Sequence, residues 1–283
     1  MGRDADGSDD TSADSSADSS ADSSANSRPS GLRVERDGAV LRLVLDRPER
    51  RNALNDAVLD AMEAAVRSPG DARVVVVTGS GERVFCSGAD LSVMADDATG
   101  LERHEARGGL RRLVVAMREC PLPVVARVQG LCLAGGVGLA LGCDVVLASS
   151  AAQFGLPEVD LGLWPFMVSA LLAAHVSPKV ASELMLTGRR ISATEAASVG
   201  LVSRVLPAET FDDDVEEVLG ALARKPPVAV RLGKAAFLSA LETPLVPALE
   251  AMQAQLSLLT TTADVAEGVT AFFEKREPRW QGR

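Results

Sequence analysis

Two loops of small residues hold the groups in this chain that could stabilise a developing negative charge. One runs from Gly79 to Leu91, after an apolar run at Val74 to Thr78. The other is Ala134-Gly135-Gly136, after an apolar run at Val124 to Val128. Glycines at a strand-to-helix turn let a ligand approach the backbone closely, and the first amides of a helix have no partner inside it. If the runs are parallel strands of one sheet, the loops could place two N–H groups around one carbonyl oxygen. The arrangement also suits a phosphate, so the glycines alone leave the ligand open.

Four sequence blocks resemble the crotonase superfamily, which includes the enoyl-CoA hydratases and isomerases. FCSGADL at 85–91 is similar to that family's F-x-x-G-A-D-[LI] loop, and VQGLCLAGGVGLALGCD at 128–144 to its V-x-G-x-x-x-G-G-G segment. FGLPEVDLGL at 154–163 is similar to F-x-x-P-E-x-x-[LI]-G, and the block at 186–207 to L-T-G-x-x-[IL]-x-A. The blocks occur in the family's order, and the resemblance covers roughly Leu32 to Arg283.

The resemblance implies an enzyme that binds an acyl-CoA thioester and stabilises its enolate. The family holds the thioester oxygen with two backbone N–H groups, which by motif position are those of Ala89 and Gly135 here. Donors aimed at that charge are worth roughly 3 kcal/mol each at the transition state. Coenzyme A enters as part of the substrate, so neither a separate cofactor nor a metal is implied.

The acid–base groups depart from the family pattern. Enoyl-CoA hydratases of this family use two glutamates, and the position of the first is Gly138 here, whereas Glu158 keeps the second. One carboxylate can still move a proton between two carbons, as in the family's double-bond isomerases, if an apolar pocket raises its pKa. We therefore favour isomerisation with Glu158 as the single acid–base group. The alternatives are a true hydratase that holds water by other groups and a catalytically weak acyl-CoA-binding protein.

Other positions match the family's CoA contacts, which are mostly made by the backbone. Arg47 stands in a turn that resembles the family's region near the CoA phosphates and pantetheine, with an ordinary surface arginine as the alternative. Phe272 and Lys275 match positions where a neighbouring subunit touches the adenine, with a solvated helix face as the alternative. The expected binding positions are Arg47, Ala53, Ser87, Gly88, Ala89, Asp90, Leu91, Gly135, Gly136, Phe272 and Lys275. Asp90 is also expected to brace its own loop.

Bulky residues stand where hydratases carry a run of small ones, directly after Leu163. They are expected to reshape the acyl end of the pocket. Trp164 and Phe166 could line that pocket or pack in the core. Asp160 could be an auxiliary acid, although a surface aspartate is the better interpretation.

The elements that must position these groups alternate between strand and helix patterns. Leu41 to Leu45 predicts a strand covered on one side, and Leu54 to Val66 predicts a helix capped by Asn55 or Asp56. Another helix is expected over Leu101 to Met117. This alternation predicts an α/β fold with a mostly parallel sheet and right-handed crossovers.

The chain becomes mainly helical after about Pro178. Ser177-Pro178 predicts a helix start and Gly188 its end, and Ser192 with Glu195 forms a capping-box pattern. Three or four more helices are expected up to Trp280. The resemblance implies a crotonase-like ββα spiral core and a helical C-terminal trimerisation region, and hence a homotrimer or a dimer of trimers.

Three regions are expected along the chain: a disordered Asp/Ser/Ala-rich tail at 1–30, the spiral core at 31–200, and the helical region at 201–283. The tail carries seven aspartates and two arginines and lacks the large apolar side chains that form a core. It has neither the basic start nor the apolar stretch of a secretory signal, and it is too acidic for a transit peptide.

Composition excludes several other classes of protein. The chain has 283 residues, of which 47% are hydrophobic, and no apolar stretch reaches the ~18 residues needed to span a bilayer. A net charge of −10 argues against nucleic acid or an anionic membrane as partner. The four cysteines show no C-x-x-C spacing, which favours free buried thiols in a reducing cytosol. With only His104 and His175, a histidine metal site is not expected.

Overall fold

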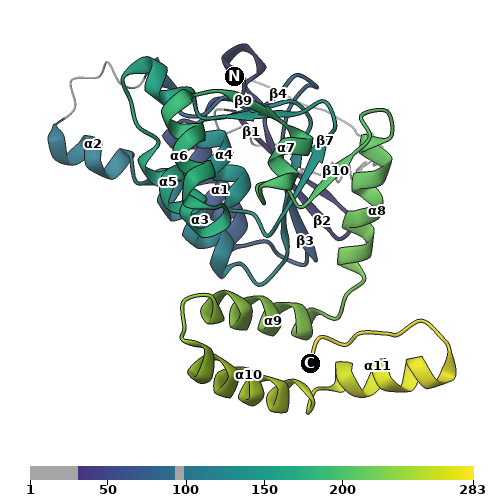
Figure 1. Cartoon of the computed structure of the whole chain (residues 1–283). Coiled ribbons are helices and arrows are strands. Elements are labelled where there is room, and N and C mark those ends of the chain that lie inside the picture. The colour runs from purple at the N-terminus through teal and green to yellow at the C-terminus, as the bar shows by residue number, and fades with distance from the viewer. Residues whose placement is uncertain (1–30, 93–98) are drawn as a thin grey trace, which may run out of the picture.

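The computed structural model describes residues 31–92 and 99–283, and its strands form a larger and a smaller sheet (Figure 1). The expected tail at 1–30 lies outside the described residues. The strands are β1 (Leu32–Asp37), β2 (Val40–Leu45), β3 (Val74–Gly79), β4 (Val84–Cys86), β5 (Val124–Val128), β6 (Leu131–Leu133), β7 (Val145–Ser149), β8 (Gln153–Gly155), β9 (Arg190–Ser192) and β10 (Arg204–Leu206). The α-helices are α1 (Asp56–Arg67), α2 (Gly100–Ala106), α3 (Gly109–Glu119), α4 (Gly135–Leu141), α5 (Phe166–His175), α6 (Pro178–Thr187), α7 (Ala193–Ser198), α8 (Phe211–Ala223), α9 (Pro227–Ala240), α10 (Leu245–Leu259) and α11 (Ala263–Glu274), and short 3-10 turns are η1 (Pro48–Arg50) and η3 (Pro157–Leu161).

The larger sheet has six strands in the order β1-β2-β3-β5-β7-β10, parallel except for β1. Val75 and Val77 of β3 join the core that includes α1 and α3, while Val74 and Val76 join the cluster under α8. This alternation follows from the two-residue period of a strand. It explains the continuous valine run, because a sheet buried on both faces has no polar side. The predicted α/β class and parallel sheet are confirmed.

The smaller sheet contains short strands in the order β4-β6-β8-β9. β4, β6 and β8 are parallel, and β9 runs antiparallel to β8. The two loops were expected after parallel strands of one sheet, and they do follow neighbouring parallel strands, but the strands that lead into them are β4 and β6 of the smaller sheet. Each long strand is followed first by a strand of the smaller sheet, whose three residues are too few to produce a recognisable period.

Local signals located most helix ends correctly. The side chain of Asn55, rather than Asp56, caps α1 by accepting from Val58 N–H. The cap at Ser192 also forms, with Oγ accepting from Glu195 N–H at 3.1 Å. The single helix expected over Leu101 to Met117 is instead two helices, α2 and α3, which meet near Gly108. Two adjacent glycines there weaken helix propensity, so the chain breaks at that point.

The first elements after residue 200 contact the larger sheet. β10 pairs with β7, and α8 covers the larger sheet through Phe211, Val215 and Leu219. The separate helical arm is α9–α11, which lies below the core in Figure 1. Lys234 anchors the start of this arm, because its ammonium donates to Asp144 at 2.7 Å, to Met117 O in the last turn of α3 and to Leu122 O just after that helix. None of the helices in the described part of the chain is long and apolar enough to cross a membrane.

Candidate active site

Ala89, Gly135 and Glu158 each follow one of three neighbouring parallel strands. Ala89 lies shortly after β4, Gly135 begins α4 just after β6, and Glu158 lies in η3 just after β8. Parallel strands end at the same edge of their sheet, which is where ligands bind in many α/β proteins. The smaller sheet therefore directs the three predicted catalytic positions to one edge. A hydrogen bond from Ala134 N to Gly155 O, 2.9 Å long, ties the start of α4 to the segment leading into Glu158.

The Ala89 amide faces away from Leu54, the residue that pairs with it. Leu54 forms a parallel bridge to Ala89, in which Leu54 N donates to Gly88 O and Asp90 N donates to Leu54 O, both at 2.8 Å. Successive amides of an extended segment point to opposite sides. The Ala89 N–H is therefore directed toward the other loop, where a Cβ built on Gly135 would lie 3.6 Å from Ala89 N.

Both amides are available to a ligand. Ala89 is exposed and Gly135 is half-buried, and neither amide donates a hydrogen bond to any of the described residues. Gly135 is the first residue of α4, where an amide has no partner within the helix. Unpaired amides on two adjacent loops are what an oxyanion hole requires, and the roles of Ala89 and Gly135 stay a prediction.

Close packing explains the small residues of the two loops. A Cβ on Gly88, which has a φ of 97°, would lie 2.6 Å from the Ala134 Cβ. Ala134 itself has a φ of 51°, a conformation that costs a non-glycine residue roughly 1–3 kcal/mol. Cys86 lies below both loops, since its Sγ accepts from Gly88 N and its carbonyl oxygen would be 2.6 Å from a Cβ on Gly136. Gly136 is thus required by packing, whatever its contact with CoA.

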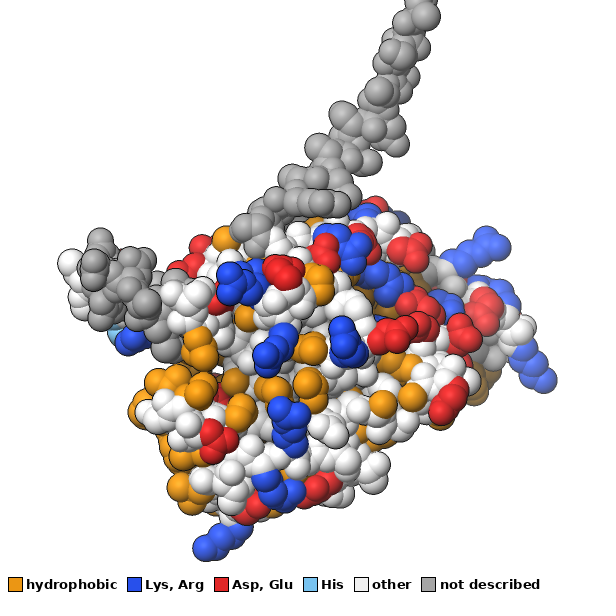
Figure 2. Space-filling view, turned by 90° about the horizontal axis from the view of Figure 1, so that it is seen from above, with side chains coloured by type: hydrophobic (Ala, Val, Ile, Leu, Met, Phe, Trp, Pro, Cys, Tyr) orange, Lys and Arg blue, Asp and Glu red, His pale blue; other side chains and the backbone are white. Residues whose placement is uncertain are grey.

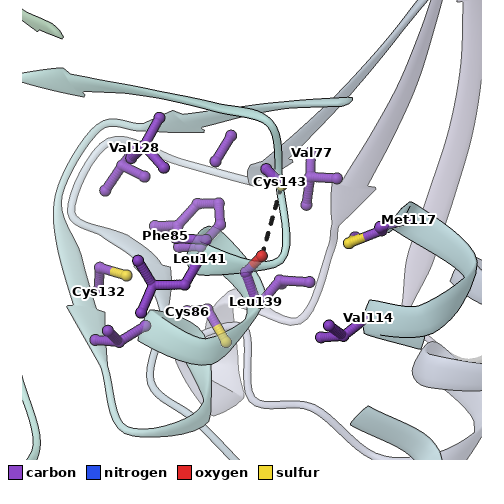
Figure 3. Close-up of a cluster of buried hydrophobic side chains, with 14 of the residues drawn as sticks. Val77, Phe85, Cys86, Val114, Met117, Val128, Cys132, Leu139, Leu141 and Cys143 are labelled. Carbon is purple, nitrogen blue, oxygen red and sulfur yellow. Dashed lines mark hydrogen bonds between the residues drawn. The ribbon is translucent and has the colours of Figure 1, made fainter. Parts of the chain in front are cut away.

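The core beneath the site holds α4 in place. Figure 3 shows Leu139 and Leu141 of α4 among Phe85, Cys86 and neighbouring apolar side chains. Leu139, Leu141 and Phe85 are each at most 5% exposed, and Cys86 is fully buried. Deep burial on the sheet side fixes the helix, and therefore the Gly135 amide that begins it.

Glu158 is a half-buried residue with an unpaired carboxylate oxygen. Its Oε2 is buried and has no hydrogen-bond partner among the described residues. Burial raises the pKa of the Glu158 carboxyl above its ordinary value of 4.5, with its own amide partly opposing the shift. The backbone around it is ordered by Leu163 N, which donates to Glu158 O at 3.0 Å. An unpaired buried carboxylate with a raised pKa is typical of a proton-transfer group.

The position of the missing first glutamate is filled by apolar side chains. A Cβ on Gly138 would lie 3.0 Å from Val168 Cγ2 and 3.3 Å from Leu110 Cδ2. Leu171 Cδ1 follows at 3.8 Å. Residues from α3 and α5 therefore occupy the space into which a side chain at 138 would extend, and they offer no polar group to hold water.

The predicted CoA-binding residues fall into two groups. Those of the 47–54 turn and the 87–91 loop lie together, since Ser87 N donates to Arg51 O and Arg47 contacts both Ala53 O and Asp90. Leu91 in this loop is 48% exposed. The expected brace at Asp90 is present, and the CoA contacts of these residues stay a prediction.

Phe272 and Lys275 form the second group, on and just after α11. They lie on the C-terminal arm, far from α4 and α5 in Figure 1. Phe272 is 78% exposed. One chain does not bring them to Glu158, so their predicted contact with CoA requires a neighbouring subunit and stays a prediction.

The bulky residues after Leu163 are divided between core and surface. Trp164 packs against the main core, while Phe166 is 77% exposed and Met167 is 41% exposed. Asp160 is also exposed. Phe166 is therefore not a core residue in the single chain.

Sequence reasoning missed two buried amides that shape the 79–84 segment. Asn52 donates to Ser80 O and Val84 O, and Gln129 donates to Gly79 O and other carbonyls of the same segment. Asn52 is 1% exposed and Gln129 is 8% exposed. The place of Gln129 directly before Gly130 was the signal that could have indicated it, whereas no glycine follows Asn52 nearby and the sequence carries no such signal for it.

Many surface arginines are already paired with carboxylates. Arg189 contacts Glu183 and Glu195, and Arg118 contacts Glu242. Figure 2 shows basic and acidic side chains interspersed on the face seen from above.

Across residues 31–92 and 99–283, no group of three or more His, Cys, Asp or Glu side chains is placed to hold a metal ion. All four cysteines are free and buried, as predicted.

Comparisons with known proteins agree with the fold and the arrangement of the loops. The family model described as enoyl-CoA hydratase/isomerase matches residues 35–283. The chain is 37% identical to the 2,3-dehydroadipyl-CoA hydratase of Escherichia coli (strain K12), over 90% of this chain and 100% of that protein. It is 36% identical to the crotonyl-CoA hydratase of Syntrophomonas wolfei, over 86% of this chain and 95% of that protein. The crystal structure of an enoyl-CoA hydratase of Mycobacterium smegmatis is similar, with a TM-score of 0.84, 33% identity and coverage of 88% of this chain and 98% of that chain.

Proposed function

The chain belongs to the enoyl-CoA hydratase/isomerase family and is an enzyme that acts on acyl-CoA thioesters, and we propose that it moves a double bond along a bound enoyl thioester with Glu158 as its single acid–base group. Two observations together carry the proposal. The buried Oε2 of Glu158 has no hydrogen-bond partner among the described residues, and the side chains around Gly138 are apolar. A hydratase mechanism with two carboxylates has no second carboxylate at that position.

The proposed reaction begins with a 3-enoyl thioester whose carbonyl oxygen accepts from Ala89 N–H and Gly135 N–H. The Glu158 carboxylate removes a proton from C2, and the electron pair moves into the thioester as a dienolate. The two amides stabilise the oxyanion at roughly 3 kcal/mol each. The protonated Glu158 then returns the proton to C4, which gives the 2-enoyl thioester and restores the carboxylate.

Hydration is the second candidate, because two similar relatives are named as hydratases. In that reaction water adds to C3 of a 2-enoyl thioester while a proton goes to C2. Glu158 would have to serve as both base and acid, because apolar groups surround position 138.

The proposed assembly is a homotrimer or a dimer of trimers formed through α9–α11. The arm presents large apolar side chains to solvent in the single chain, and burial of such surface drives association. These side chains are Phe237, Leu241, Leu245, Val246, Leu249, Leu256, Leu258, Phe272 and Phe273. The four free thiols support a location in the cytoplasm.

The test incubates the protein separately with 2-enoyl-CoA and 3-enoyl-CoA and follows product mass. Isomerised product without a change in mass supports the proposal, whereas gain of one water supports hydration. Glu158→Gln should lower kcat by about 10²- to 10⁴-fold, with little change in acyl-CoA affinity. Asp160→Asn is the matched control on the same turn and should keep wild-type turnover. Wild-type turnover in Glu158→Gln would refute the single-glutamate mechanism.

A further inference from the structure

We propose that Arg47 and Asp90 are positioning residues, whose ion pair holds the Ala89 amide in the orientation needed for the oxyanion hole. The inference rests on the proposed function, because it assigns a role to the same Ala89 N–H. It differs from a CoA-phosphate contact for Arg47, since the guanidinium would act through the protein and not on the substrate.

The guanidinium of Arg47 spans the two segments that form the Ala89 bridge. Its Nη1 donates to Ala53 O at 2.8 Å and its Nη2 donates to Asp90 Oδ2 at 2.7 Å. Ala53 directly precedes Leu54, and Asp90 directly follows Ala89. The side chain therefore links the two segments right beside the backbone bridge between Leu54 and Ala89.

Both members of the pair are held on their other sides. The second oxygen of Asp90 accepts from Ser92 N at 3.1 Å and from Ser92 Oγ at 2.7 Å. The Arg47 backbone N–H donates to Asn52 Oδ1 at 3.1 Å. A Cβ on Gly31 would lie 2.3 Å from Arg47 Cγ, so the stem of the arginine occupies space that only a glycine leaves open. The pair therefore has one well-defined arrangement.

Burial makes this pair more than a surface contact. The Arg47 side chain is 15% exposed and the Asp90 side chain is 9% exposed. Removal of the Arg47 guanidinium would leave Asp90 Oδ2 and Ala53 O without this donor, and removal of the Asp90 carboxylate would leave Arg47 Nη2 without its acceptor, in a poorly solvated place. A shift of the 87–91 loop toward water would let the unpaired groups form hydrogen bonds with solvent. The same shift would turn the Ala89 N–H away from Gly135.

A misplaced donor weakens catalysis more than it weakens binding. Displacement of a catalytic group by about 1 Å can cost on the order of 10²-fold in rate. We therefore expect Arg47→Gln and Asp90→Asn each to lower kcat by about 10- to 100-fold, with KM changed less than about threefold. Arg47→Lys keeps the charge but cannot reach both acceptors, and should recover only part of the rate.

The experiment uses the full-length protein and two thioesters of one acyl group, with CoA and with pantetheine, which lacks the nucleotide phosphates. Positioning predicts the same kcat loss with both thioesters, and a double variant no worse than the poorer single one. If Arg47 instead contacts a CoA phosphate, Arg47→Gln should raise KM for the CoA thioester only, and Asp90→Asn should have no effect. That result would overturn the proposal. Arg50→Gln is the matched control, because Arg50 is exposed on the same turn.

A second readout does not depend on turnover. Hydrogen–deuterium exchange of the Leu54 and Asp90 amides, which form the bridge, should be roughly tenfold faster in Arg47→Lys than in Arg50→Gln. Unchanged exchange would overturn the proposal even if the protein were inactive. Wild-type protein without activity on any enoyl-CoA would count against the proposed function alone, while active variants with wild-type kcat would count against the positioning role alone.

Discussion

Gly138→Glu would place a carboxylate at the position of the family's first glutamate. We expect this substitution to destabilise the fold. A Cβ at this position would already be 3.0 Å from Val168 Cγ2. Such overpacking costs about 1–3 kcal/mol, and placing a carboxylate among apolar side chains adds several kcal/mol more. Glutamate has a higher helix propensity than glycine, which offsets less than about 1 kcal/mol of this loss. The net loss should be about 3–5 kcal/mol.

A thermal melt checks this prediction directly. For a chain of this size each kcal/mol shifts Tm by about 2–4 °C, so Gly138→Glu should melt roughly 10 °C below wild type. Gly233→Glu is the matched control, because a Cβ on Gly233 of α9 meets no heavy atom within 4 Å. It should keep or slightly raise Tm.

A second variant separates the steric effect from the charge. Gly138→Glu combined with Val168→Ala removes the closest contact and should recover about 1–2 kcal/mol relative to Gly138→Glu alone. The product masses of this double variant with 2-enoyl-CoA show whether a restored carboxylate adds water. If Gly138→Glu by itself melts within about 2 °C of wild type, then the space at this position is not filled as the side-chain distances indicate.

Four further predictions concern catalysis, stability and assembly. Since Glu158 acts first as a base and burial raises its pKa above the ordinary 4.5, kcat/KM should rise with pH through an apparent pKa above that value, and a rate independent of pH there would contradict the role. Lys234→Met leaves the Asp144 carboxylate, whose side chain is 25% exposed, without its cation and should cost about 1–3 kcal/mol in urea unfolding. Leu249→Asp, at a side chain 59% exposed on α10, should shift the assembly toward monomer in size-exclusion chromatography. Deletion of residues 1–30 should leave activity and Tm nearly unchanged, and a fall of more than a few degrees would show that the tail is docked.

Motifs and local signals predicted a substantial part of this protein. Asn55 and Ser192 mark helix starts because a cap depends on hydrogen bonds within a few residues. Pro178 marks another start because its fixed φ suits the first helical position. The alternation of apolar runs and amphipathic segments predicted the α/β class, because these patterns too depend on residues close together in the chain. The family blocks identified Glu158 and the two loops, whose catalytic roles stay predictions.

Pairing between distant segments decided the rest. Three-residue strands carry no periodic signal, so only the tertiary structure shows that β4, β6 and β8 belong to a second sheet, at one edge of which the predicted catalytic positions lie. The ion pair of Arg47 with Asp90 joins residues 43 apart in the chain, and the filling of the space at Gly138 depends on α3 and α5. The sequence by itself determined which residue types are available and where helices begin, because those depend on neighbours along the chain. Which side chains face one another depends on long-range packing, and this only the folded chain decides.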